Sequence, residues 1–272
     1  MIAWLKNLDD LLRGNKTTPE RLAEGTRHIE LKPLIGIGVV LGILYGVFMG
    51  LFAVASRTPA CPEQLLATAV KVPALFFLTL LVTFPSLYVF SALLGVRLGP
   101  ADTLRLLVAA IAVNLAVLAS FGPITGFFVL STTSYYFIKL LNVAFFAVAG
   151  TIGLGFLMRA LNRLEAAQVA SEAEEGEEKV PSIDALVEDS PAKPGVPVAQ
   201  VAPWPSPLPR PSTARRVFRV WVVLYALVGA QMGWILRPFI GAPDLPFVLF
   251  RGRQDWILVD VLQAIGKLLS SR

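Results

Sequence analysis

Long apolar runs separated by short polar segments dominate the first 158 residues of this sequence, and a further run follows a long polar stretch. A transmembrane helix needs about 20 predominantly apolar residues. Each run has that length and lacks the period-two alternation of a half-buried strand. The sequence therefore predicts an all-α fold, a polytopic transmembrane helical bundle of about five spans. The expected spans cover residues 34–55, 72–95, 101–121, 135–158 and 217–240.

Both ends of the chain carry apolar residues at helical spacing opposite charged or polar residues, a pattern typical of interfacial amphipathic helices. Near the amino terminus, Leu5, Leu8 and Leu12 share such a face. Near the carboxy terminus, Leu262 and Leu269 do the same. We expect the amino-terminal helix to anchor in the interface, with partner recruitment as the alternative. The carboxy-terminal helix is expected to lie in the membrane surface or to pack on the bundle.

Changes in composition divide the chain into five parts. These are a cytoplasmic amphipathic segment (1–33), a four-span core (34–158), a disordered acidic and proline-rich cytoplasmic linker (159–215), the fifth span (216–240), and a loop with an amphipathic carboxy-terminal helix (241–272). The linker favours extended polyproline II conformations and has too few apolar residues to fold. We interpret it as a tether, and a docking strip for a proline-binding partner is the alternative.

The composition argues against a soluble protein, because 55% of the 272 residues are hydrophobic and only 16% are charged. The single cysteine, Cys61, excludes an intrachain disulfide, and the single histidine, His28, has no neighbouring ligands with which to bind a metal. The net charge of +5 is scattered, so membrane lipids rather than nucleic acid are the expected partners. Catalytic motifs are absent from the sequence, which predicts a protein that is not an enzyme and needs no cofactor.

The positions of lysine and arginine predict the orientation. Six lie in residues 1–33 and eight lie between Arg159 and Arg219, whereas the segments on the other side hold few. By the positive-inside rule the amino terminus is cytoplasmic, and the expected location is the bacterial cytoplasmic (inner) membrane. The basic carboxy-terminal tail departs from this rule, which leaves a re-entrant segment at 239–250 open. The uncharged segment 122–134 is a second re-entrant candidate.

Four glycines form the strongest single pattern. Gly38, Gly42, Gly46 and Gly50 recur every four residues and so lie along one face of the first span. In lipid, helices associate through close packing, which glycine permits. The pattern predicts packing against another helix of the same chain. A homo-oligomer through the first span and a ligand groove are the alternatives.

Polar residues near or within the spans are the remaining candidates. We expect Lys71, Lys139 and Arg237 near one level on the outer side, where they could bind an anion such as a phospholipid head group. Independent snorkelling of each side chain to the interface is the favoured alternative. Asp102 and Arg105 are spaced to pair on one helical face. Three further residues, expected to form hydrogen bonds between helices, are Asn114, Asn142 and Gln231.

The arrangement of spans resembles the Yip1-like group of five-span membrane proteins. The stretches KVPALFFLTL at 71–80, FPSLY at 84–88 and GAQMGWILRP at 229–238 are similar to bacterial members of this type. For eukaryotic members, the resemblance implies membrane trafficking and organisation through protein contacts. For bacterial members it implies little beyond location. The Asp-Leu-Tyr-Gly-Pro motif of eukaryotic members is missing before the first span, so their small-GTPase partnership is not carried over.

These features together predict a non-enzymatic membrane-organising or adaptor protein that acts through helix packing and cytoplasmic segments. A protein partner is expected at residues 1–30 or at the proline-rich linker. The alternative function is a small transporter or channel. Its polar path would be lined by Lys71, Lys139, Arg237, Asn114 and Gln231.

Overall fold

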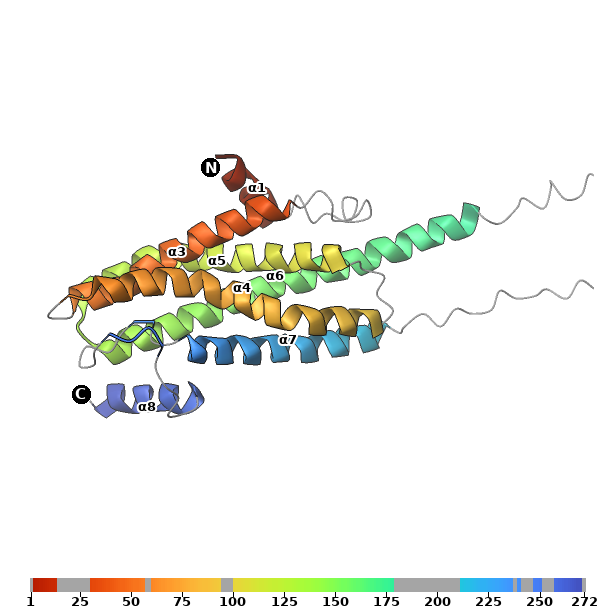
Figure 1. Cartoon of the computed structure of the whole chain (residues 1–272). Coiled ribbons are helices and arrows are strands. Elements are labelled where there is room, and N and C mark those ends of the chain that lie inside the picture. Colours follow the sequence, from red (N-terminus) through yellow and green to blue (C-terminus); the bar gives the residue numbers. More distant parts are fainter. Residues whose placement is uncertain are drawn as a thin grey trace, which may run out of the picture.

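Every regular element that the structure describes is a helix (Figure 1). The computed structural model describes residues 2–13, 30–56, 60–93, 100–178, 211–236, 239–240, 247–250 and 257–270. In chain order the helices are α1 (Ile2–Leu12), α3 (Leu31–Ala55), α4 (Pro62–Leu93), α5 (Pro100–Ser131), α6 (Tyr135–Glu178), α7 (Pro211–Ile235) and α8 (Ile257–Ser270).

Four of these helices are long and apolar enough to cross a membrane. Their spanning parts are Leu31–Ala55, Pro62–Ser86, Ala101–Ser131 and Tyr135–Ala160. They confirm an all-α protein with four potential membrane spans. The apolar part of α7, Val223–Ile235, is shorter than a span, so the fifth span stays a prediction.

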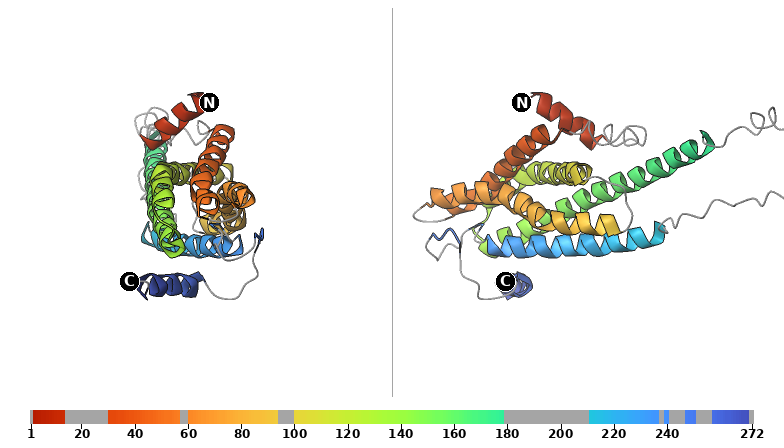
Figure 2. Two further views of the ribbon diagram at one scale, coloured as in Figure 1. Left: turned by 90° about the vertical axis from the view of Figure 1, so that its left-hand side faces the viewer. Right: turned by 45° about the vertical axis from the view of Figure 1, so that its right-hand side comes forward.

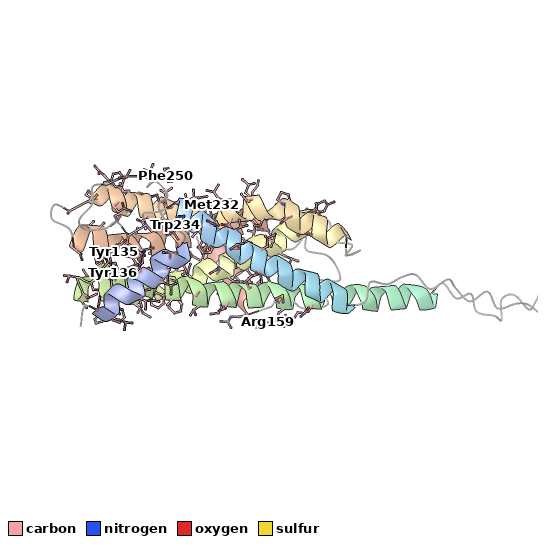
Figure 3. All side chains as sticks on the ribbon, turned by 90° about the horizontal axis from the view of Figure 1, so that it is seen from below. Tyr135, Tyr136, Arg159, Met232, Trp234 and Phe250 are labelled. Carbon is pink, nitrogen blue, oxygen red and sulfur yellow. The ribbon has the colours of Figure 1, made fainter. Side chains whose placement is uncertain are left out.

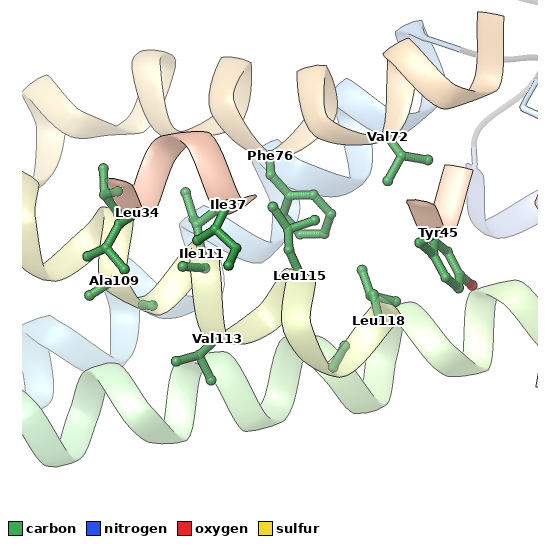
Figure 4. Packing of buried hydrophobic residues seen from close by; sticks show 14 of the residues in the cluster. Leu34, Ile37, Tyr45, Val72, Phe76, Ala109, Ile111, Val113, Leu115 and Leu118 are labelled. Atoms are coloured by element: carbon green, nitrogen blue, oxygen red, sulfur yellow. The ribbon is translucent and has the colours of Figure 1, made fainter. Parts of the chain in front are cut away.

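The four long helices lie side by side in a bundle, with α5 at its centre (Figures 1 and 2). Helix α3 contacts both α4 and α5, α5 contacts α6, and α7 lies along α4. The central place of α5 shows in its burial. The protein buries 67% of the most apolar stretch of α5 but only 22% of that of α6. Figure 4 shows Ile111 and Leu115 of α5 among buried side chains from α3 and α4.

Both terminal helices fold back onto this bundle. Helix α1 contacts α3 and α5, and its Leu8 and Leu11 belong to the buried core, with Leu11 fully covered. Helix α8 contacts α6 and α7. At each end of the chain, one side of the amphipathic helix therefore packs on the bundle.

Helices α4 and α5 extend further than the sequence predicts. Helix α4 begins at Pro62 rather than at 72, since proline is well suited to the first position of a helix. Helix α5 continues through Gly122 and Pro123 to Ser131, so the expected loop at 122–134 reduces to Thr132–Ser134. The re-entrant candidate 122–134 is therefore helical as far as Ser131 and not a loop. A Cβ on Gly122 would lie 2.5 Å from Phe48 Cδ2, which shows how closely this part of α5 packs on α3.

The largest difference concerns the predicted linker. Helix α6 does not end at 158 but continues to Glu178, so the prediction of disorder is wrong for 159–178. This stretch is rich in alanine, glutamate, leucine and arginine, which have high helix propensity, so it stays helical without an apolar face of spanning length. Residues 211–215 begin α7. The remainder of the predicted linker, 179–210, lies outside the described residues.

The glycine face of α3 packs mainly against the backbone of α4. An ideal Cβ on Gly46 would lie 2.7 Å from Ala69 Cα, and one on Gly50 would lie 2.8 Å from Leu65 Cα. One on Gly42 would lie 2.9 Å from Pro73 Cβ. Real Cβ atoms do not approach other atoms this closely, so any larger residue forces the two helices apart. Gly38, at the other end of the face, is in ordinary contact with side chains of α4 and α5.

These contacts predict a strong effect of a single methyl group. We expect Gly46→Ala to lower the free energy of unfolding by about 1–3 kcal/mol through overpacking. Gly150→Ala in α6 is the matched control, because a Cβ there would meet nothing within 4 Å; alanine should leave stability unchanged or raise it by up to about 1 kcal/mol. Unfolding of the detergent-solubilised protein, followed by circular dichroism, measures both. Equal effects of the two substitutions would contradict the close packing of α3 on α4.

Candidate functional site

A buried hydrogen-bonded group joins α3 to α6. The Tyr45 hydroxyl donates to Asn142 Oδ1 at 2.7 Å, and Asn142 Nδ2 donates to the Ile138 carbonyl at 2.8 Å. Tyr45 is fully buried and Asn142 is 2% exposed, so in hydrocarbon these groups satisfy one another where water cannot. The structure thus gives Asn142 an interhelical hydrogen bond.

Asn114 behaves differently. It lies on α5 and is 8% exposed, and its Oδ1 has no hydrogen-bond partner among the described residues. A Cβ on Gly153 of α6 would lie 3.0 Å from Asn114 Cβ, so this asparagine marks a close approach of α5 and α6. The described structure gives this oxygen no partner, so the expected interhelical hydrogen bond of Asn114 stays a prediction. The sequence pattern did indicate the interface between α5 and α6.

Gln231 lies half-buried on α7. The glycines on either side of it mark the contact of α7 with α4. A Cβ on Gly229 would lie 3.6 Å from Thr79 Cγ2, and one on Gly233 would lie 3.8 Å from Leu75 Cδ1. Small residues four positions apart again allow two helices to approach. Figure 3 shows the neighbouring Met232 and Trp234 on the same helix.

The beginning of α4 presents a polar face that binds the chain segment following α7. Gln64 Nε2 donates to the Phe239 carbonyl at 2.9 Å, and the Thr68 hydroxyl donates to the same oxygen. The Lys71 ammonium donates to the Leu249 carbonyl and lies 5.1 Å from the centroid of the Phe250 ring. Gln64, Thr68 and Lys71 are all buried.

This polar face was missed at the sequence level, where 64–71 is expected to precede the span. The spacing of Gln64, Thr68 and Lys71, four and then three residues, is the signal that identifies one face of a helix. The described parts of 239–250 lie against this face, so carbonyls that would otherwise face hydrocarbon gain donors.

The other cations of the expected anion site have their own surroundings. Lys139 Nζ lies 6.0 Å from the Tyr135 ring centroid, at the start of α6. A further lysine near this end, Lys267 of α8, is not part of that expected site, and its Nζ donates to the Tyr136 hydroxyl at 3.0 Å. Arg237 lies outside the described residues. Lys71 and Lys139 thus contact different groups, and a single site built from all three cations stays a prediction.

The opposite end of the bundle carries the ion pair that the spacing predicts. Arg105 Nη1 lies 3.2 Å from Asp102 Oδ1 in the first turns of α5. Both side chains are partly exposed, so the pair is solvated and contributes little to stability. In the described part of the chain, His, Cys, Asp and Glu do not gather in groups of three or more that could hold a metal ion.

The two asparagines provide a contrasting pair of substitutions. Asn142→Leu leaves the buried Tyr45 hydroxyl without its acceptor, and we expect it to lower the free energy of unfolding by about 1–3 kcal/mol. Asn114→Leu replaces a buried group whose oxygen is unpaired with an apolar one of similar size, and we expect unchanged or higher stability. Detergent unfolding curves of the two variants test this. A loss of stability in Asn114→Leu equal to that in Asn142→Leu would show that Asn114 has a partner in the folded protein.

Comparisons with known proteins leave the site to be judged by its geometry. The chain matches no protein-family model, no curated protein and no solved structure. The described polar groups connect α3 with α6 and α4 with the segment after α7. The arrangement is therefore one of helix joining, with cations and tyrosines at the end of the bundle where α4 and α6 begin.

Proposed function

We propose that this chain is a non-enzymatic membrane-organising or adaptor protein that holds a partner through its cytoplasmic segments. The observation that carries the proposal is the length of α6. The helix continues from the end of its apolar part at Ala160 to Glu178, which adds about 27 Å at 1.5 Å per residue. Figure 1 shows this arm extending beyond the other helices. Such an arm places the segment that follows it well away from the membrane surface.

The charge of this arm suits a docking role. Its last turns carry a cluster of five acidic residues, and the proline-rich tract follows it along the chain. Proline-rich segments bind partners at low entropic cost because they are already extended. The cluster consists of Glu172, Glu174, Glu175, Glu177 and Glu178.

The amino-terminal segment is a weaker candidate for the partner site. Part of the apolar face of α1 is occupied, since Leu8 and Leu11 pack into the core. Among the other described side chains of this segment, Lys6, Asp9, Leu12 and Arg13 are exposed. We therefore favour the linker over residues 1–30. The glycine face of α3 is likewise covered within the chain, so the proposal does not extend to a homo-oligomer through that face.

The use of the buried polar groups supports an adaptor over a transporter. Asn142 binds Tyr45, and Lys71 binds a main-chain carbonyl; both join elements of the bundle. An organising role through protein contacts is also what the resemblance to the Yip1-like group implies for its eukaryotic members. We include membership of that group in the proposal.

The proposal includes a fifth span and a cytoplasmic amino terminus in a bacterial inner membrane. Helix α7 lies along α4, and it begins at the end of the bundle from which the arm of α6 emerges (Figure 1). This arrangement fits a linker that begins and ends on the same side of the membrane. The arginines at 215, 216 and 219 then lie on the cytoplasmic side, as the positive-inside rule favours.

The single cysteine tests this orientation directly. Cys61 lies immediately before α4 and is partly exposed, so a membrane-impermeant maleimide should label it in intact cells. In a Cys61→Ser background, Ser190→Cys in the linker should be labelled only after permeabilisation, and Ser270→Cys on α8 should be labelled without it. Labelling of Ser190→Cys in intact cells would contradict the orientation. Protection of Ser270→Cys in intact cells together with labelling of Cys61 would contradict the fifth span.

The adaptor role predicts a partner that depends on the linker. In-membrane photocrosslinking and mass spectrometry should capture a specific protein with the full chain and lose it when residues 179–210 are replaced by a Gly/Ser segment of equal length. Replacing the five glutamates with glutamine retains helix propensity and isolates the contribution of charge. Identical captures from all three chains would contradict the role. Specific solute flux in reconstituted vesicles, abolished by Lys139→Ala, would favour the transporter instead.

A further inference from the structure

Helix α8 has three distinct sides. Ala264 is 1% exposed and Val261 and Leu268 are half-buried, so this side packs on the bundle. At 100° per residue, a second side carries four exposed apolar residues, and a third carries the exposed polar residues Gln263, Lys267 and Ser270. We call the second side the apolar sector; it comprises Val259, Leu262, Ile265 and Leu269.

The apolar sector is unusually exposed for a helix that packs on a bundle. Leu262 is 67% and Leu269 is 70% exposed, and at 100° per residue both lie on the side of the helix that faces away from Ala264. Leu81 of the spanning helix α4 is 68% exposed and therefore has the same exposure within an apolar segment of spanning length. Contiguous exposed apolar surface of this kind marks contact with lipid or with another protein.

The position of α8 points to lipid rather than to another protein. Helix α8 lies against α6 and α7 rather than beyond the ends of the bundle, and it crosses α6 near Tyr135 and Tyr136 (Figure 3). Lys267 bonds the Tyr136 hydroxyl at 3.0 Å, at the first turn of a potential span. Tyrosine and lysine at the end of a spanning helix are typical of the head-group level. The rest of α8 therefore lies beside lipid-facing surface of α6.

A second segment at the same end of the bundle points to the same conclusion. Residues 247–250, held on α4 through Lys71, are four consecutive apolar residues and all are exposed. Their side chains are 36–54% exposed, next to the beginning of a potential span. Exposed apolar side chains of α8 and of this segment thus gather around the end of the bundle where α4 and α6 begin.

We infer that α8 lies within the lipid leaflet at the Tyr135 end of α6, with its apolar sector on phospholipid acyl chains and its polar side at the head groups. With 14 residues, about 21 Å long, the helix is too short to cross the membrane and so enters one leaflet only. The border between the apolar sector and Gln263, Lys267 and Ser270 matches the boundary between hydrocarbon and head groups. This inference goes beyond the adaptor role and depends only on the four spans.

Site-directed spin labelling of the full chain tests the inference. In a Cys61→Ser background, single cysteines replace Leu262 in the apolar sector, Gln263 on the polar side, or Leu81 as the reference for lipid contact. The labelled proteins are reconstituted in vesicles of phosphatidylcholine and phosphatidylglycerol. Collision rates with oxygen, which concentrates in hydrocarbon, and with a water-soluble nickel chelate are then compared.

The expected result is an oxygen-to-nickel ratio at Leu262 close to that at Leu81 and several-fold above that at Gln263. Equal ratios at Leu262 and Gln263, both below Leu81, would place α8 in water and overturn the inference. Spin–spin broadening between Leu262 labels, lost on dilution with unlabelled protein, would show a second copy on the apolar sector and overturn it as well. A low ratio at Leu81 itself would overturn the spanning arrangement together with the inference.

Discussion

Close contact between the glycine face of α3 and the backbone of α4 is the constraint on which the rest of the bundle depends. In lipid, apolar side chains gain little by leaving hydrocarbon for other apolar side chains, so helices need close packing to associate. At Gly46 that packing is between main chains, since a Cβ would lie 2.8 Å from the Thr68 carbonyl oxygen. With α3 and α4 held together in this way, α5 has a fixed surface against which to bury Leu115 and Leu118.

Polar residues complete what the small residues begin, but they do so unevenly. The Tyr45–Asn142 hydrogen bond joins α3 to α6, two helices that also meet through the ring pairs Tyr45–Phe146 and Phe52–Tyr135. Asn114 also lies close to a neighbouring helix, since a Cβ on Gly153 would lie 3.0 Å from Asn114 Cβ. Its oxygen, however, has no partner in the described structure. Burial of an asparagine in a membrane protein is thus not sufficient to show that it bonds another helix. The partner depends on which residue the neighbouring helix presents at that level.

The features that could be predicted from the sequence are those set by the length of the apolar runs and by the spacing of residues along a helix. Four spans followed from apolar runs, and the Asp102–Arg105 pair followed from helical spacing. Helix ends were missed where polar residues continue a helix. Gln64 and Thr68 look like a link before the span, but both donate to the Phe239 carbonyl of a distant segment. Gly122 and Pro123 look like a loop, but Phe48 packs over the glycine and the helix continues. Such tertiary partners are not encoded in local pattern.

Helix α6 connects the two ends of the molecule at which function is proposed. At its first turn, Tyr136 receives Lys267 of α8; at its last, the helix ends in the acidic cluster, far outside the bundle. Because one continuous helix joins these points, the proposed partner at the arm and the proposed lipid at α8 would contact the same element. Among the four potential spans, α6 is the least buried, with 22% of its most apolar stretch covered by the protein. The helix that carries both proposed contacts is therefore the span that shares least surface with the core.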